Sequence, residues 1–178
     1  MSTTRLEAFS DGVLAIIITI MVLELKIPHG SALIDLQPLI PIFLTYALSF
    51  QIIGIYWNNH HHLLHAAKEI NSKIMWANLN LLFWLSLIPF ATGWLGENYT
   101  QSWPTAMYGI LLLLAAGAYQ ILQKTITKEK SDNETKGKLS LICYMLAVFL
   151  AFVNPIFSDL LYASVALMWF IPKHIKIS

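Results

Sequence analysis

The sequence predicts an all-α integral membrane protein with six transmembrane helices in each chain. Of its 178 residues, 57% are apolar and 12% are charged, and the mean hydropathy is +0.61. A soluble domain has roughly 45–50% apolar and about 25% charged residues, so this chain carries too little charge to cover a water-soluble enzyme. A net charge of +1 without a basic run also excludes a nucleic-acid-binding surface.

Six apolar segments with short connections are the second observation. A spanning helix takes about 20 apolar residues, so six spans occupy roughly 120 positions and leave about 58 for ends and connections. Connections this short leave no room for a soluble domain, and we expect one membrane domain over 1–178. The expected spans are residues 8–25, 39–65, 74–95, 104–122, 139–157 and 160–172.

Helix breakers or charged residues bound the spans. The first span follows Arg5, and because no small-residue cleavage site comes after it, we expect a retained helix and not a secretory signal. Pro and Gly residues in 28–31 and 93–104 separate the first span from the second and the third from the fourth. The charged stretch 124–138 leads into the fifth span, and the sixth is the shortest.

The basic residues predict the orientation. If the N-terminus is cytoplasmic, ten of the 11 Lys and Arg residues fall on the inside, and only Lys26 falls outside. Cytoplasmic loops of membrane proteins carry such an excess. The bias requires an even number of spans, with both termini cytoplasmic.

The first span contains an ionisable residue, Asp11, which is costly in a membrane unless it finds a partner or water. At about 100° per residue, Ile16, Thr19, Ile20 and Leu23 form one stripe of this helix. Asp11 lies about 140° around the helix from Ile16 at that spacing. We therefore expect Asp11 to face neighbouring helices and not the direction of the stripe.

A polar run closes the second span, and in the predicted topology it lies on the same side of the membrane as Ser10 and Asp11. Because polar groups in lipid pair across helices, we expect the run to hydrogen-bond these two residues. Such contacts contribute about 0.6–2 kcal/mol each, so several together would fix the pose of the first helix. The run comprises Asn58, Asn59, His60, His61 and His62.

One motif indicates a resemblance to a known protein family. Arg5 stands four residues before Phe9, Ser10 and Asp11, a helix rich in Ile, Thr and Leu follows, and Asn-Asn-His-His-His closes the second span. Over its whole length the sequence resembles the six-helix potassium-channel family of the endosomal/lysosomal membrane, in particular its single-repeat bacterial homologues. A second Phe-Ser-Asp, at 157–159, lacks the Arg four residues earlier and is expected in an outside loop, so we interpret it as coincidence.

The resemblance implies a pore lined by the first helices of several chains. Apolar side chains one or two turns beyond the motif form its narrowest part, which by spacing corresponds to Ile16, with Thr19, Ile20 and Leu23 continuing the lining. One copy of the six-helix unit per chain implies a homotetramer, in which four Ile16 side chains form a ring. The chain contains no Thr-Val-Gly-Tyr-Gly carbonyl filter of the usual potassium-channel type.

The function implied is that of a potassium-preferring cation channel, a multi-pass protein of the cell membrane with permeant K⁺ ions and no cofactor. A hydrophobic ring offers no oxygen to replace hydration water, so an ion must shed or deform its shell to pass. Potassium holds its water less tightly than sodium and loses less by doing so. The hydroxyl of Thr19 would add oxygen beside the ring.

The main alternative is a proton- or metal-coupled transporter that uses Asp11 and the cluster His60–His62. His61 and His65, at i and i+4, have a usable metal-ligand spacing, but a membrane metalloenzyme needs more histidine pairs. Transporters of this kind often show internal repeats, and we find none between residues 1–89 and 90–178. We expect no metal and no enzyme activity, and a hydrogen-bonding role for the histidines.

For each of two charged residues, the sequence leaves two interpretations open. Glu24, at the outer end of the first helix, either forms an acidic mouth that concentrates cations or is a solvated surface charge near Lys26. Arg5 either joins the polar network of the motif or marks the cytoplasmic boundary.

Overall fold

The computed structural model describes residues 2–67, 69–127 and 134–170, and all regular structure in these ranges is helical. Two 3-10 helices, η1 (Val22–Glu24) and η2 (Leu33–Leu39), lie in the connection between the first two α-helices. The α-helices are α1 (Thr3–Met21), α2 (Ile40–His65), α3 (Ser72–Ser86), α4 (Ile88–Glu97), α5 (Ser102–Ile126), α6 (Glu134–Leu150) and α7 (Pro155–Phe170).

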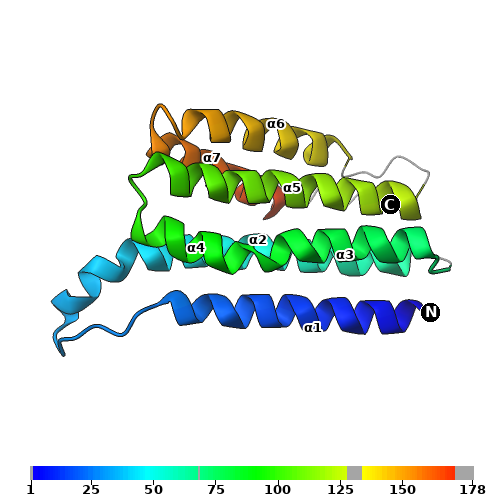
Figure 1. Ribbon diagram of the computed structural model, residues 1–178, viewed down its shortest axis with the longest axis horizontal. Coiled ribbons are helices and arrows are strands. Elements are labelled where there is room, and N and C mark those ends of the chain that lie inside the picture. Colours follow the sequence, from blue (N-terminus) through cyan, green and yellow to red (C-terminus); the bar gives the residue numbers. More distant parts are fainter. Residues whose placement is uncertain (1, 68, 128–133, 171–178) are drawn as a thin grey trace, which may run out of the picture.

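The helices lie side by side along one axis, and successive segments run in opposite directions (Figure 1). α1 lies at one edge of the bundle, where it contacts α2, α3 and α4. α5 packs against α3 and α4 on one side and against α6 on another, so it connects α6 to the α3–α4 segment. α7 runs back toward the end of the bundle at which α1 begins (Figure 1).

α3 and α4 form one membrane-length segment with a break at Leu87, the residue that caps both helices. Pro89 has no N–H to donate to the carbonyl one turn earlier, which accounts for the break. With this pair counted as one segment, the described helices form six segments that correspond to the six expected spans. Four segments are long and apolar enough to cross a membrane, by length and composition: Thr3–Glu24, Leu33–His65, Ser72–Glu97 and Ser102–Ile126.

The last two helices have other boundaries than expected. The expected span 139–157 runs past Leu150, where α6 ends. The side chain of Asn154 accepts a hydrogen bond from the backbone N–H two residues later (3.0 Å), and Pro155 occupies the first position of α7. Both residues favour the start of a new helix. The end of the expected span 160–172 lies outside the described residues.

The expectation that 157–159 form an outside loop is wrong, because these residues belong to the first turns of α7. Ser158 is fully buried and donates a hydrogen bond to the carbonyl of Ala147 in α6 (2.8 Å). This second Phe-Ser-Asp therefore ties α7 to α6.

Buried hydroxyl groups join three segments in the half of the bundle away from the N-terminus. Thr92 of α4 donates to Ser49 of α2 (2.8 Å), and the Ser49 hydroxyl also lies 2.8 Å from that of Tyr108 in α5. All three side chains are fully buried. Since water is excluded there, each hydroxyl must find a protein partner, and this requirement fixes the relative position of α2, α4 and α5.

Replacing Gly96 by alanine is expected to destabilise the bundle by about 1–3 kcal/mol. A Cβ at this position would lie 2.8 Å from the Cα of Ile42 in α2, a backbone atom that cannot turn away. Thermal unfolding of the purified protein in detergent measures the effect. Gly117→Ala is the matched control, because a Cβ there meets nothing within 4 Å; equal Tm values for the two variants would contradict the close approach of α4 and α2.

Candidate functional site

α1 has one face that packs against the rest of the chain. Its buried residues recur every three or four positions, as expected for an amphipathic helix. The N-terminus is capped by Ser2, whose hydroxyl accepts from the backbone N–H of Arg5 (3.4 Å). The buried residues are Leu6, Ser10, Leu14, Ile17 and Met21.

The opposite face of α1 is exposed in the single chain and carries Ile16, Thr19 and Ile20 of the stripe expected to line a pore, and Leu23 follows in η1. Ile16 is 58%, Ile20 43% and Leu23 76% exposed, and Thr19 is exposed between them. The Thr19 hydroxyl donates to backbone carbonyls of its own helix, at 3.1 Å from that of Ala15 and 3.0 Å from that of Ile16. Its proton is therefore directed to the backbone, and its oxygen remains able to accept.

Phe9 shares this exposed face. Its side chain is 49% exposed, and helical spacing places it within about 20° of the direction of Ile16. The motif thus divides between the two faces of α1, with Phe9 on the exposed side and Ser10 on the buried side.

Ser10 forms the centre of a buried chain of hydrogen bonds. Its hydroxyl donates to the carbonyl of Leu6 (2.8 Å) and accepts from the side-chain NH₂ of Asn78 in α3 (2.9 Å). The Asn78 carbonyl oxygen lies 2.6 Å from Nε2 of His60 in α2. Ser10, Asn78 and His60 are at most 1% exposed.

The directions of these hydrogen bonds determine the tautomer of His60. Because the Asn78 oxygen can only accept, Nε2 of His60 carries a proton and donates. In the neutral imidazole Nδ1 is then bare, and among the described residues it has no hydrogen-bond partner. Every donor points from α2 through α3 to α1, so the three helices are held in one register.

Asp11 forms a second link between α1 and α2. Its Oδ1 accepts a hydrogen bond from Nε1 of Trp57 (3.0 Å). Asp11 is half-buried and faces the neighbouring helix, whereas the Trp57 ring is 46% exposed.

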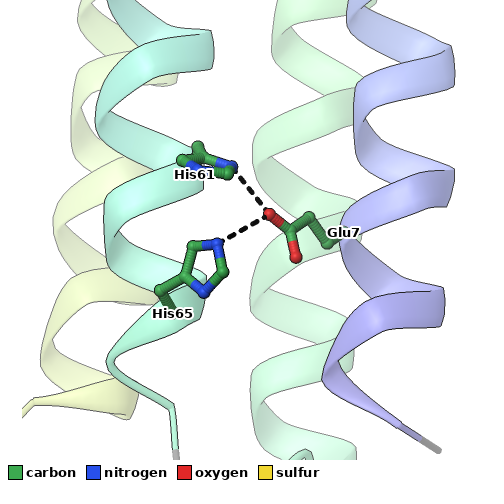
Figure 2. A group of neighbouring side chains, drawn as sticks. All are labelled: Glu7, His61 and His65. Carbon is green, nitrogen blue, oxygen red and sulfur yellow. Dashed lines mark ion pairs between the residues drawn. The ribbon is translucent and has the colours of Figure 1, made fainter.

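Glu7 forms a third link, one turn nearer the N-terminus. Its Oε1 lies 2.7 Å from Nδ1 of His61 and 3.3 Å from Nε2 of His65 (Figure 2). Both histidines project from the last turns of α2 toward α1 (Figure 2). The His61 and His65 rings stand edge to face with their centroids 4.5 Å apart.

The remaining residues of the expected network lie elsewhere. Arg5, Asn58 and His62 are exposed, and their side chains form no hydrogen bond or ion pair within the described ranges. The backbone carbonyl of Asn59 accepts from the Tyr119 hydroxyl (3.2 Å), and its side chain lines a cavity of about 240 Å³ between α2, α5, α6 and α7.

Three partners were missed from the sequence, namely Asn78, Trp57 and Glu7. An amide within an apolar span is itself a signal, because such a group needs a partner in lipid, and Asn78 lies inside the third span. The structure pairs Ser10 with Asn78 instead of with Asn58 or Asn59.

Glu24 folds back against α4. Its carboxylate occupies the space that a side chain at Gly93 would need, and it is half-buried. Lys26 forms an ion pair with Glu97 at the end of α4, and this carboxylate raises the pKa of Lys26. Glu24 thus packs against α4 of its own chain, and Lys26 pairs with Glu97 instead of with Glu24.

The model of the family described as the endosomal/lysosomal potassium channel TMEM175 matches residues 5–89. This range contains Glu7, Ser10, His60 and Asn78, the groups that anchor α1. The rest of the chain is covered by longer matches to individual proteins.

A potassium channel of Chryseobacterium sp. (strain P1-3) is 50% identical over 181 residues, which cover 97% of this chain and 94% of that protein. A crystal structure of a lysosomal potassium-selective channel TMEM175 homolog from Chamaesiphon minutus superposes with a TM-score of 0.85 at 27% identity, over 94% of this chain and 96% of that one. The endosomal/lysosomal proton channel TMEM175 of Homo sapiens is 35% identical over 96 residues, 47% of this chain and 19% of that longer protein. These matches show that the chain belongs to the TMEM175 family of channels.

Proposed function

We propose that this multi-pass membrane protein is a potassium-preferring cation channel whose pore is lined by α1. The observation that carries the proposal is the exposed stripe that Ile16 and Ile20 form on α1 and Leu23 continues in η1, since the other face of α1 is anchored by buried hydrogen bonds. A helix held this firmly on one side presents the other side in a defined orientation. The names of the relatives support potassium as the permeant ion.

The proposed assembly is a homotetramer with both termini cytoplasmic. Four copies of α1 around one axis would place four Ile16 side chains in a ring and remove the stripe from lipid. The excess of Lys and Arg on one side supports the orientation. The direction of α7, which runs back to the end where α1 begins, fits an even number of crossings (Figure 1).

The proposed filter combines an apolar ring with hydroxyl oxygens one turn away. The ring selects by the cost of dehydration, which is smaller for potassium than for sodium, and it closes when water leaves it. Thr19 directs its proton to the carbonyls of Ala15 and Ile16, so its oxygen can face a cation. Neither device needs an enzymatic step or a cofactor.

Reversal potentials in a planar bilayer test this function. With purified protein, potassium on one side and sodium on the other, we expect unitary currents that reverse toward the potassium equilibrium potential. Slow flux without unitary currents, dependent on a proton gradient, would contradict the channel.

The second candidate is proton conduction or proton coupling through Asp11 and the cluster His60–His62. The observation in its favour is the continuous chain of hydrogen bonds from His60 through Asn78 to Ser10. This chain ends at the carbonyl of Leu6, however, and a backbone carbonyl does not take up a proton and pass it on. The same bilayer measurement, repeated with a pH difference at equal potassium, separates the two functions, since a potassium channel then gives no net current at zero voltage.

A further inference from the structure

Glu7, His61 and His65 bring three metal-ligating groups together at the N-terminal end of α1 and the C-terminal end of α2 (Figure 2). The histidines occupy positions i and i+4 of one helix and therefore lie on one face of it. Glu7 reaches them from the other helix. Helical spacing places Glu7 about 180° from Ile16, so the group lies away from the proposed pore lining.

The donor atoms lie close to the separations that a transition-metal ion requires. They are Nδ1 of His61, Nε2 of His65 and a carboxylate oxygen of Glu7, all within 4.8 Å of one another. Tetrahedral zinc has bonds of about 2.0–2.1 Å, which places its ligand atoms about 3.3 Å apart. The Glu7 oxygen lies 2.7 Å from one nitrogen and 3.3 Å from the other, so a small opening of the first contact would admit the ion.

The group is also accessible to an ion. The side chain of Glu7 is 16% exposed, and those of His61 and His65 are 39% and 61% exposed. Two imidazoles and one carboxylate leave a fourth position for water on the open side, as in other zinc sites with three protein ligands.

We propose that Glu7, His61 and His65 bind a divalent transition-metal ion of the zinc class and that the ion clamps α1 to α2. Two neutral imidazoles and one carboxylate are ligands that such ions prefer. The bound ion replaces the direct contact of Glu7 with the histidines by stronger bonds from the same three side chains. The binding claim stands by itself, whereas an effect of the clamp on current rests on the proposed channel function.

Zinc titration of the purified full-length protein in detergent, followed by calorimetry, tests the site. We expect one Zn²⁺ per chain. Substitution of a ligand should weaken binding at least about tenfold, because even groups that only support a ligand change metal affinity by about 10–100-fold. The variants are His65→Ala and Glu7→Gln, and His65 has the most exposed side chain of the three.

His62→Ala is the matched control, since His62 is an exposed neighbouring histidine outside the group. We expect it to bind Zn²⁺ like the unmodified protein. Failure of the unmodified protein to bind, or an equal loss of affinity in His62→Ala and His65→Ala, would overturn the proposal.

Thermal unfolding gives a second readout of the clamp. An ion that binds only the folded state raises Tm as its concentration exceeds Kd, so Zn²⁺ should raise Tm in the unmodified protein and in His62→Ala but not in His65→Ala. Bilayer recordings then show whether Zn²⁺ changes the current in the same pattern. A protein that binds Zn²⁺ through these residues but passes no potassium current would retain the metal site and contradict only the channel function.

Discussion

Ile16→Asn is expected to raise the single-channel conductance several-fold and to bring the potassium and sodium permeabilities close together. In the proposed tetramer, four amide groups would replace four apolar side chains at the constriction. Amide oxygens offer partial replacement of hydration water, so the dehydration cost that separates the two ions falls. The ring would also stay wet, because polar groups hold water where a hydrophobic ring releases it.

Bilayer recordings of the variant, with the same ion gradients as for the unmodified protein, measure both quantities. Ile121→Asn is the matched control, because Ile121 on α5 is exposed to a similar extent, 55% against 58% for Ile16. The control carries the same cost of an amide on an exposed membrane face but lies outside the proposed pore. Unchanged conductance and selectivity in Ile16→Asn would remove Ile16 from the filter.

The two faces of α1 show how far the sequence predicts the site. Helical spacing turns Asp11 away from Ile16, and in the structure Asp11 bonds to Trp57 of α2 whereas Ile16 is exposed. This separation depends only on the helix period, which the sequence carries. Whether the stripe lines a pore depends on the contacts between chains, and it stays a prediction.

The identity of the partners depends on tertiary packing and could not be predicted in the same way. Ser10 was expected to meet the polar run of α2, but α3 packs beside α1 and supplies Asn78 instead. Glu7 occupies an unspecified position of the motif, between Arg5 and Phe9, and only the approach of the last turns of α2 brings it to His61 and His65.

The helix boundaries show a different gap between sequence and structure. Hydropathy predicts apolar segments but not the break at Leu87 or the start of α7 at Pro155. Both breaks stand beside a proline, whose missing N–H ends one helix and suits the first turn of the next. Both prolines are visible in the sequence, but the residues around them are apolar, so hydropathy alone predicts no break at these positions.

Asn78→Leu is expected to lower the stability of the bundle by about 1–4 kcal/mol, because it removes two interhelical hydrogen bonds that contribute about 0.6–2 kcal/mol each in lipid. Leucine has the same branching and the same number of heavy atoms as asparagine, so the change removes the polar groups and keeps the outline of the side chain. Nε2 of His60 then has no acceptor, and the Ser10 hydroxyl loses one donor, both at fully buried positions. Thermal unfolding in detergent should show a lower Tm and fewer folded channels.

Asn80→Leu is the matched control, since Asn80 lies on the exposed side of the same helix and accepts a hydrogen bond from Trp84 one turn later (3.2 Å). A double-mutant cycle with Ser10→Ala tests whether the loss of stability comes from the hydrogen bond between Asn78 and Ser10. If the hydroxyl and the amide act through one bond, the double variant should lose less stability than the two single variants together. A Tm for Asn78→Leu equal to that of Asn80→Leu, or strict additivity with Ser10→Ala, would contradict the buried chain as the anchor of α1. An α1 without this anchor could turn about its own axis, and the direction of Ile16 would then no longer be fixed by the fold.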